Sequence, residues 1–187
     1  MTTSSQPKIH IYYGYGKGKT TSGIGLAVRA VGAGHRVAIV QFDKGYDGTN
    51  EHYSERHVLR GLQGLDLFPT GCERMMSTGG FRFKNRPEDF EEAKRGLQIA
   101  HGLIEKGTHH LVILDEILAA VMTKLISQED VLGVLNLYEG KGRPFELVIT
   151  GHQVWDELVA RADLVTEMRK VKHYFDKGLK ARQGIEF

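Results

Sequence analysis

The sequence has little of what stabilises secreted or membrane proteins. It contains a single cysteine, Cys72, in 187 residues, so no intrachain disulfide can form, which is typical of proteins in a reducing cytoplasm. No apolar run approaches the roughly 20 residues that cross a bilayer. Residues 1–7 are polar and lack the apolar core of a signal peptide. We therefore expect a cytoplasmic protein in which residues 1–7 form a flexible amino-terminal segment.

A strong excess of charge is also missing. The 25 Lys and Arg residues and 23 Asp and Glu residues give a formal net charge of +2, which is too small to indicate a nucleic-acid partner. Internal repeats and low-complexity segments are absent as well. A chain of this length that is 41% hydrophobic and 26% charged can bury one core. We therefore predict a single domain over residues 1–187.

Nine histidines invite a metal hypothesis, but their spacing argues against it. His109 and His110 are adjacent, and adjacent side chains on a strand point to opposite faces of the sheet. They therefore do not converge on one ion, and we expect no histidine metal centre.

The stretch from Gly14 to Thr21, with the sequence Gly-Tyr-Gly-Lys-Gly-Lys-Thr-Thr, is the strongest motif. An apolar run over residues 9–13 precedes it and a helical pattern over residues 24–31 follows, which is the order of a phosphate-binding P-loop. Glycines let successive backbone N–H groups turn toward one anion, and the helix N-terminus adds its own unpaired N–H groups. The alternative is a glycine turn followed by a surface lysine.

Within this motif, individual side chains have separate expected roles. Lys19 can reach the outer phosphates, and the hydroxyl of Thr20 can bind Mg²⁺. Tyr13 stands where the strict P-loop pattern has glycine, so we expect a variant loop with an unusual phosphate geometry.

The acidic pair Asp115-Glu116 ends an apolar run that begins at Leu111. A strand with a carboxylate at its tip is the Walker B pattern, in which the carboxylate helps to hold Mg²⁺ near the P-loop hydroxyl. The alternative is an acidic N-cap for the helix that follows.

The remaining pattern predicts a mostly parallel α/β sheet flanked by helices. Pro87 suits the first turn of a long helix that Gly107 ends, and Ser127 and Asp130 form a capping-box-like start. The expected strands are 8–13, 36–42, 65–68, 111–116, 145–149 and 163–168, and the expected helices are 19–33, 51–62, 87–107, 127–138 and 154–162.

Polar residues follow several of these strands, where ligands of open α/β sheets gather. Lys44 lies in the Asp-Lys-Gly sequence that ends the second strand, and Thr150-Gly151-His152 ends the strand over residues 145–149. Each could instead be an ordinary polar loop, and His152 a neutral surface residue. Arg29 lies on the P-loop helix, where a solvated position is the alternative.

Two further segments are candidates for function. Residues 72–86 form a long irregular stretch in which Phe81 and Phe83 accompany glycines and basic residues; such loops are usually functional or disordered. Their spacing would also let both rings tuck into the core on one face of a short strand. The tail over residues 170–187 is basic, and its aromatic pair favours docking near the active site over a solvated end.

A P-loop determines where phosphate charge is stabilised but not which atom is attacked. Attack on the terminal phosphorus makes a kinase or an ATPase. Attack on the ribose C5′ makes an adenosyltransferase with triphosphate as the leaving group, and the same loop would serve because charge must again be held on the phosphate chain.

The whole chain resembles the P-loop family of ATP:corrinoid adenosyltransferases. The resemblance implies a RecA-like P-loop fold and transfer of the 5′-deoxyadenosyl group of ATP to the cobalt(I) of a reduced corrinoid, with triphosphate leaving. The matching segments are 14–21, 29–32, 40–45, 79–83, 114–116, 149–151, 162–168 and 172–186.

The resemblance also implies roles for residues. Lys19 would act on the leaving triphosphate, and Phe81 and Phe83 would exclude the lower axial ligand of the corrin, because a four-coordinate cobalt(II) ion is easier to reduce. Thr20 and Glu116 would position Mg²⁺, with Asp115 close by. The residues implied in binding ATP and the corrinoid are Gly14, Tyr15, Gly16, Lys17, Gly18, Lys19, Thr20, Thr21, Arg29, Lys44, Thr150, Gly151 and His173.

The chain departs from the family pattern at several points. Phe83 stands where the family often has tryptophan, and His152 where it often has arginine. The segment before the first strand is short, so the site must be closed differently or left more open. The family further implies reversed binding of the ATP phosphates, a homodimer, and a flavoprotein-type electron donor. A kinase or ATPase and a non-catalytic carrier of nucleotide or corrinoid are the competing hypotheses.

Overall fold

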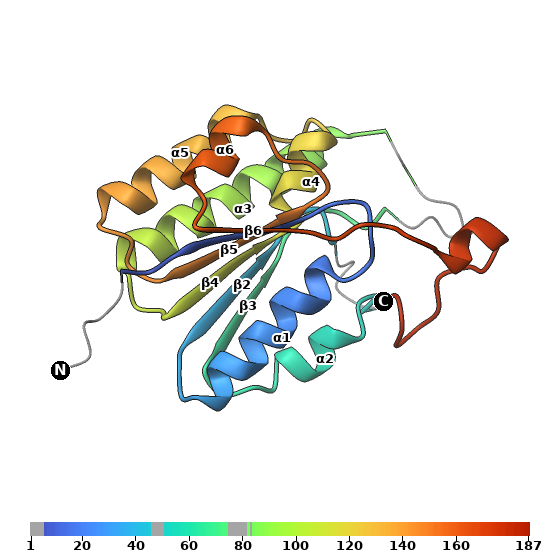
Figure 1. The fold of residues 1–187 in the computed structure, drawn as a ribbon, viewed down its shortest axis with the longest axis horizontal. Helices are drawn as coiled ribbons and strands as arrows, with labels where there is room; N and C mark the ends of the chain where they lie inside the picture. Colours follow the sequence, from blue (N-terminus) through green and yellow to red (C-terminus); the bar gives the residue numbers. More distant parts are fainter. Residues whose placement is uncertain (1–5, 46–50, 75–81, 83) are drawn as a thin grey trace.

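The fold is a six-stranded parallel sheet with helices on both faces, as predicted (Figure 1). The structure is a computed structural model that describes residues 6–45, 51–74, 82 and 84–187. The strand order is β3-β2-β4-β5-β1-β6, and every pair of neighbours is parallel. The strands are β1 (Ile9–Tyr13), β2 (Val37–Gln41), β3 (Leu65–Pro69), β4 (Leu111–Asp115), β5 (Glu146–Gly151) and β6 (Leu164–Glu167).

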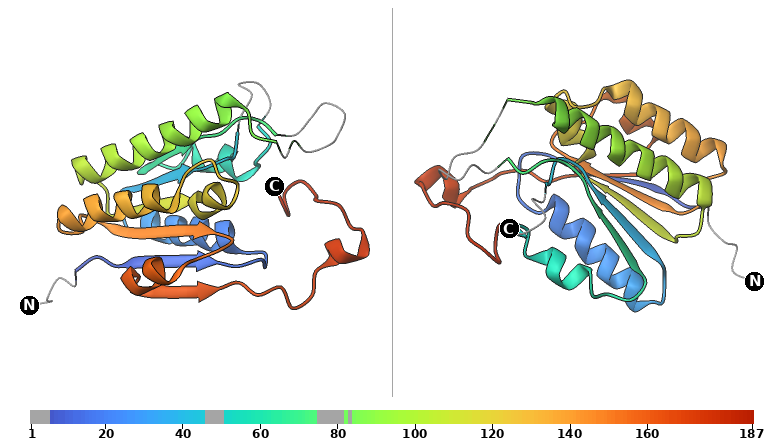
Figure 2. Two further views of the ribbon diagram at one scale, coloured as in Figure 1. Left: turned by 90° about the horizontal axis from the view of Figure 1, so that it is seen from above. Right: turned by 180° about the vertical axis from the view of Figure 1, so that it is seen from behind.

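Two layers of helices enclose this sheet. Figures 1 and 2 show α1 and α2 on one face and α3, α4, α5 and α6 on the other. The described elements are α1 (Lys19–Gly32), α2 (Glu55–Leu59), α3 (Pro87–Lys106), α4 (Ile117–Met122), α5 (Gln128–Gly140), α6 (Asp156–Arg161) and the 3-10 turn η1 (Tyr174–Lys177).

Each face of the sheet has its own apolar core. Ile113 packs in the cluster beneath α1, whereas its neighbour Leu114 packs beneath the helices of the other face, because successive strand residues point in opposite directions. All residues of β2 and β4 are buried, as expected of central parallel strands that are covered on both sides. Burial of each such aliphatic side chain contributes about 1.5–3 kcal/mol.

The long helices begin and end where their capping residues predicted. α3 starts at Pro87, and the carboxylate of Asp89 accepts a hydrogen bond from the main chain of Arg86 at 2.7 Å. It ends at Gly107, which takes a left-handed conformation with φ 57°. The side chain of Ser127 accepts from the main chain of Asp130 at the start of α5.

The predicted helix over residues 51–62 is wrong in extent, because α2 covers only Glu55–Leu59. Glu51, four residues before α2, is not helical, and its carboxylate pairs with Arg56 at 3.0 Å. Gly61 and Gly64 follow soon after the end of α2. Within the described part of the chain, no helix is long and apolar enough to cross a membrane.

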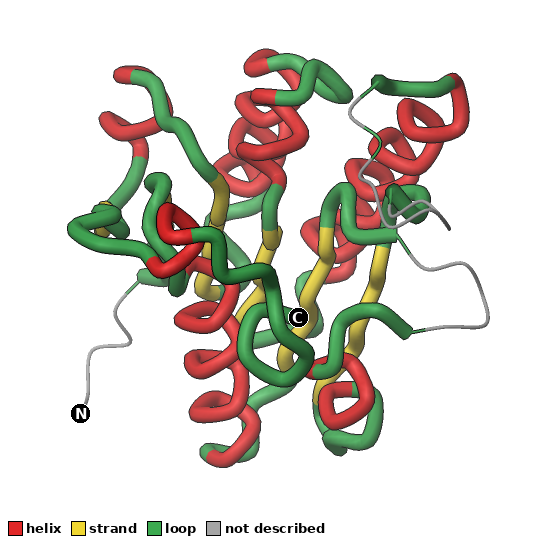
Figure 3. The backbone as a smooth tube through the Cα atoms, turned by 90° about the vertical axis from the view of Figure 1, so that its right-hand side faces the viewer, coloured by secondary structure: helices red, strands yellow, loops and turns green. Residues whose placement is uncertain are grey.

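The topology brings the carboxyl ends of β1, β2, β4 and β5 to one edge of the sheet. Figure 3 looks onto this edge and shows residues after β6 passing in front of it, with the end of the chain near its centre. The P-loop and the two predicted strand-tip segments therefore all lie at this edge. Phe81 and Phe83 lie outside the described residues, so their predicted positions remain predictions.

Candidate active site

The glycines of the phosphate loop are required by close backbone packing. Gly14 has φ 115°, and a Cβ there would lie 2.5 Å from the main-chain oxygen of Met168. A Cβ on Gly16 would lie 2.6 Å from that same oxygen, which accepts the Gly16 N–H at 2.7 Å. Tyr13 needs no such freedom: it is the last residue of β1 and pairs with residues of β5 and β6. The substitution at the first glycine position is therefore accommodated in a paired strand.

Lys19 opens α1 and is nearly buried. Its ammonium donates to the main-chain oxygen of Gly16 at 3.0 Å, so the side chain curls back over the loop. Burial lowers the pKa of Lys19, partly offset by the charges of Glu116 and Asp115. A desolvated ammonium facing loop amides and a helix N-terminus suits an anionic ligand.

Asp115, at the tip of β4, is 2% exposed, and both of its carboxylate oxygens are hydrogen-bonded. One carboxylate oxygen is 2.6 Å from the ammonium of Lys44, and the other accepts from the hydroxyl of Thr150 at 2.8 Å. Burial alone would raise the pKa of Asp115, but the charge and hydrogen bond of Lys44 hold it below its ordinary value. Asp115 is therefore an ionised carboxylate inside the protein.

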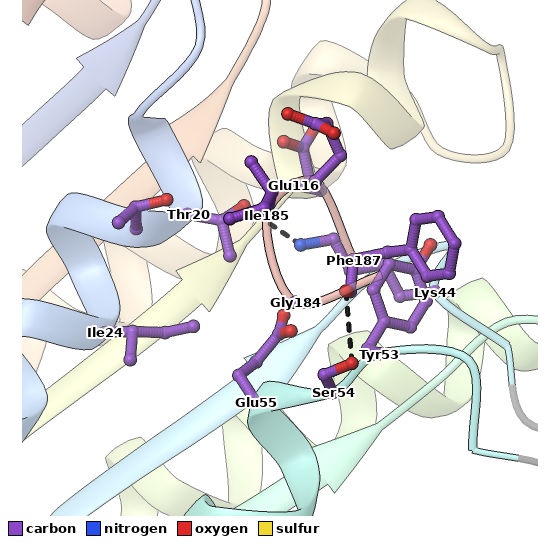
Figure 4. A pocket seen from close by; sticks show the side chains of 12 residues that line it. Thr20, Ile24, Lys44, Tyr53, Ser54, Glu55, Glu116, Gly184, Ile185 and Phe187 are labelled. Atoms are coloured by element: carbon purple, nitrogen blue, oxygen red, sulfur yellow. Dashed lines mark hydrogen bonds between the residues drawn. The ribbon is translucent and has the colours of Figure 1, made fainter. Parts of the chain in front are cut away.

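The next residue, Glu116, stands at the N-cap position of α4 with φ 61°, but its side chain makes no capping hydrogen bond. Its main-chain N–H donates to the hydroxyl of Thr150 at 2.9 Å. Burial and the neighbouring charge of Asp115 raise the pKa of Glu116. Its carboxylate oxygen lies 3.7 Å from Nδ1 of His152. The side chain is thus free of the helix end and points into a cavity (Figure 4).

Two of the predicted Mg²⁺ ligands, Thr20 and Asp115, contact one cation, the ammonium of Lys44. It lies 2.6 Å from Asp115 and donates to the hydroxyl of Thr20 at 2.9 Å. Burial alone would lower the pKa of this ammonium, but the charges of Asp115 and Glu116 raise the pKa above its ordinary value. The hydroxyl and the carboxylates are hard oxygen donors, and Mg²⁺ commonly takes one or two carboxylates with substrate phosphates as its remaining ligands. These are ligand types that Mg²⁺ prefers, and in this structure the ammonium of Lys44 occupies the place between Thr20 and Asp115.

Arg56 is a residue of this site that sequence reasoning missed. Its guanidinium is fully buried and donates to the side chains of Gln41 at 2.7 Å and Glu51 at 3.0 Å. It also donates to the main-chain oxygen of Lys44 and stacks on Tyr53, 4.7 Å from the ring centroid. One arginine thereby fixes the backbone that carries Lys44. No local motif signals this role.

Two cavities meet at Lys44 and Glu116. The first, of about 600 Å³, lies between α1, the start of α2 and the end of the chain (Figure 4). The second, of about 380 Å³, lies between β2, α4 and the loop after β5. The first is lined by Thr20, Thr21, Ile24, Lys44, Tyr53, Ser54, Glu55, Glu116 and residues 184–187. The second is lined by Phe42, Asp43, Lys44, Tyr53, Arg74, Glu116, Ala119, Met122, Thr123 and His152.

The other strand-tip residues lie close to the loop. Gly14 donates its N–H to the main-chain oxygens of Gly151 and His152 at 3.2 and 3.1 Å. Gly151 has φ 153°, and a Cβ there would lie 2.5 Å from that of Leu118. The hydroxyl of Tyr15 accepts from the side chain of Gln153 at 2.6 Å. Gly18, with φ 123°, precedes α1.

Among the predicted site residues, Arg29, His173 and Lys17 have other surroundings or partners. Arg29 is in the last turn of α1, ten residues beyond Lys19 and hence about 15 Å along the helix; it lines another cavity at the amino ends of the strands. His173 caps η1 by accepting from the main chain of Phe175. Lys17 contacts Glu186 at 2.8 Å, and no contact with the loop's other side chains is seen among the described residues.

His109 and His110 also have separate partners. His109 is 2.8 Å from Asp66, and Nδ1 of His110 accepts the main-chain N–H of Arg36 at 3.1 Å. In the described ranges, no three His, Cys, Asp or Glu side chains are grouped so that they could hold a metal ion.

Arg82, which separates the two predicted aromatic residues, is firmly held. Its guanidinium makes a bidentate pair with Asp89 at 2.6 and 2.8 Å. The main-chain N–H of Arg82 donates to the main-chain oxygen of Arg74 at 2.8 Å. Asp89 is 1% exposed, and the hydrogen bonds from Arg82 lower its pKa from 3.8 to about 2.

This pair predicts an acid-sensitive contribution to stability. A carboxylate whose pKa is depressed by folding stabilises the protein above its unfolded pKa, and the stabilisation is lost as the pH falls from about 4 toward 2. We expect the free energy of unfolding of the parent protein to decline over this range more steeply than that of Asp89→Asn. Denaturant titrations at several pH values measure both slopes, and equal slopes would contradict the assignment.

Comparison with known proteins agrees with this geometry. Residues 5–187 match the family model described as ATP:corrinoid adenosyltransferase BtuR/CobO/CobP. The corrinoid adenosyltransferase of Escherichia coli K12 is 34% identical over 183 residues, covering 96% of this chain and 85% of the relative. That of a Sinorhizobium species is 34% identical over 192 residues, covering 100% and 84%. The Salmonella typhimurium corrinoid adenosyltransferase CobA is 33% identical over 181 residues, covering 96% and 85%. The chain therefore belongs to the P-loop family of ATP:corrinoid adenosyltransferases.

Proposed function

We propose that the two cavities bind ATP and a reduced corrinoid, and that the protein joins them by transferring the 5′-deoxyadenosyl group of ATP to cobalt. The observation that carries this proposal is the arrangement of two cavities around Lys44 and Glu116, directly beside the phosphate loop. An ATPase, whose second reactant is water, needs only the first cavity. A second, largely apolar cavity of about 380 Å³ suits one part of a second substrate.

The reaction exchanges one bond for another. Cobalt(I) supplies an electron pair to C5′ of the ribose, the cobalt–carbon bond forms, and cobalt becomes formally cobalt(III). The C5′–oxygen bond breaks, and its electrons leave with triphosphate. Charge therefore develops on the phosphate chain, so fixed positive groups aimed at that chain lower the barrier.

The phosphate loop and the first cavity beside it are suited to holding that charge. Lys19, Thr20 and Thr21 stand at the N-terminus of α1 with the loop amides, where triphosphate would be bound. Mg²⁺ would take the hydroxyl of Thr20 and the carboxylates of Asp115 and Glu116, and would neutralise part of the leaving charge. Arg29 and His173 are not included in this intrachain site, because they lie apart from both cavities.

The proposal extends to partners for which the family match is the support. Cobalt(II) must be reduced before it can attack, so the reaction needs an electron donor, which in this proposal is of the flavoprotein type. Phe81 and Phe83 would aid the reduction by excluding the lower axial ligand. Arg82, between them, is anchored to Asp89. A homodimer in the cytoplasm completes the proposal.

The assay for this function identifies both products. Incubation with ATP, Mg²⁺ and chemically reduced cobalamin is expected to yield adenosylcobalamin and triphosphate in equal amounts. Formation of ADP and phosphate without corrinoid would instead identify a kinase or an ATPase. Binding of both substrates without turnover would identify a carrier.

The aromatic residues are tested by comparing two cobalt oxidation states. We expect Phe81→Ala and Phe83→Ala to slow the reaction that starts from cobalt(II) at least about tenfold, roughly 1.4 kcal/mol in the barrier, and to spare the reaction supplied with cobalt(I). Phe90→Ala, on the partly exposed face of α3, is the matched control. Electron paramagnetic resonance with cobalt(II) corrinoid and ATP should show a four-coordinate signal that both variants lose. Equal losses in both reactions would mean that the rings only pack the core.

A further inference from the structure

The end of the chain forms one wall of the first cavity. After β6 the chain leaves the sheet, forms η1 and returns, so that residues 184–187 lie opposite Thr20 and Thr21 (Figures 3 and 4). Residues 184–187 are called the terminal segment below. Because a cavity of about 600 Å³ remains between this segment and the phosphate loop, the segment lines the site and does not fill it.

One side of the terminal segment is attached to the phosphate loop through Lys17. The Lys17 ammonium donates to the carboxylate of Glu186 at 2.8 Å, the main-chain oxygen of Ile185 at 2.7 Å and the hydroxyl of Tyr174 at 3.1 Å. An ammonium group has three N–H donors, and the three acceptors all belong to the tail. Lys17 therefore has no donor left for a phosphate in this arrangement.

Glu186 is itself held from the tail side. Its carboxylate accepts from the main chain of Arg182 at 2.8 Å, from the Arg182 guanidinium at 3.2 Å, and from the hydroxyl of Tyr174. Its side chain is only 15% exposed, in contrast to the 41% of Lys17. The carboxylate is thus held by groups of the tail as well as by Lys17, and the lysine joins the loop to this turn.

The other side of the terminal segment is attached to the residues before α2. The hydroxyl of Ser54 donates to the main-chain oxygen of Phe187 at 3.1 Å. The Phe187 ring stacks on His52 with a centroid separation of 4.4 Å and an interplanar angle of 7°. The segment therefore bridges two walls of the cavity, and Ile185 and Phe187 bring apolar surface to it.

We propose that Lys17 is a positioning residue, which pairs with Glu186 to hold the terminal segment against the nucleoside part of ATP. In this arrangement Ile185 and Phe187 contact the nucleoside, while the phosphates stay with Lys19 and the threonines of α1. The inference rests on the proposed ATP site and assigns the terminal segment as the part of that site that contacts the nucleoside. It assigns Lys17 to the tail, in place of the direct ligand-binding role that the resemblance implies.

A charge reversal separates these two roles of Lys17. ATP binding to the full chain is measured by titration calorimetry with Mg²⁺ and without corrinoid, for Lys17→Glu, Glu186→Lys and the double variant. We expect each single change to weaken binding about tenfold, as the loss of a charge-assisted hydrogen bond does, and the double variant to recover most of that loss. Proteolysis near residues 177–182 should rise in the single variants and fall again in the double.

The opposite pattern would overturn the inference. If Lys17 binds phosphate, Glu186→Lys leaves ATP binding unchanged or strengthens it, and the double variant stays as weak as Lys17→Glu. Because corrinoid is absent from this measurement, failure of adenosyl transfer would not produce either pattern.

Removal of residues 185–187 is the second test. Unlike the charge-reversed double variant, the shortened chain does not depend on a new ion pair. Inorganic triphosphate and ATP are the two probes. We expect the shortened chain to bind triphosphate as the parent does and ATP about tenfold more weakly. Equal weakening for both probes would place the segment on the phosphates, and tighter ATP binding would make it an obstruction; both results would overturn the proposal.

Discussion

Replacing Lys44 with methionine is expected to lower the free energy of unfolding by about 3–5 kcal/mol, the usual cost of removing one partner of a buried ion pair. Asp115 would be left 2% exposed with neutral hydroxyl partners, Thr150 and Thr20, and no compensating charge from Lys44. Methionine keeps the length and much of the apolar stem of lysine, so most of the loss reports the missing charge. Equilibrium denaturation in guanidinium chloride measures it.

Magnesium should partly restore this variant. The carboxylate of Asp115 and the hydroxyl of Thr20, which both contact the Lys44 ammonium, would be open to a hydrated divalent cation. We expect millimolar Mg²⁺ without nucleotide to raise the melting temperature of Lys44→Met more than that of the parent. Lys141→Met removes an exposed pair with Glu105 and should cost less than about 1 kcal/mol. A variant as stable as the parent and indifferent to Mg²⁺ would show that Lys44 does not compensate Asp115.

The second large effect is expected at Arg56. Arg56→Met should also cost about 3–5 kcal/mol, because Glu51 and the main-chain oxygen of Lys44 lose a fully buried donor. Arg56→Lys should recover little, because a single ammonium cannot supply the planar fork that serves several acceptors at once. The melting temperature and denaturant midpoint of both variants measure these losses.

Arg36→Met is the matched control for this experiment. Arg36 pairs with Asp66 at 3.1 Å, but its side chain is 54% exposed, so its loss should change stability by less than about 1 kcal/mol. If Arg56→Lys were as stable as the parent, the fork geometry would not matter. If Arg36→Met and Arg56→Met were equally destabilised, burial would not explain the cost.

The parts of the site that could be predicted are those that depend on short stretches of sequence. The phosphate loop and the carboxylate at the tip of β4 each occupy a few consecutive residues, whose conformation follows from glycine, helix N-terminus and strand pattern. The parallel topology then brings such strand tips to one edge. Thr20 and Asp115 are accordingly found on either side of one cation.

The parts that could not be predicted depend on contacts between distant positions. Lys17 and Glu186 are 169 residues apart, and no spacing rule joins them. Arg56 lies in a helix of five residues with no periodic pattern, yet it determines how the chain around Lys44 is held. Arg29 lies almost three turns along the P-loop helix from Lys19, so the binding role that the resemblance implies for it stays a prediction.

The anchoring of the phosphate loop to Met168 has a mechanical consequence. Met168 follows β6, a marginal strand whose four residues are all exposed, and its main-chain groups bond to both Tyr13 and Gly16. Margins of a sheet fray at lower free energy than its interior. The phosphate loop is therefore anchored to an exposed outer strand of the sheet. Detachment of β6 would loosen the loop while the central strands stay paired.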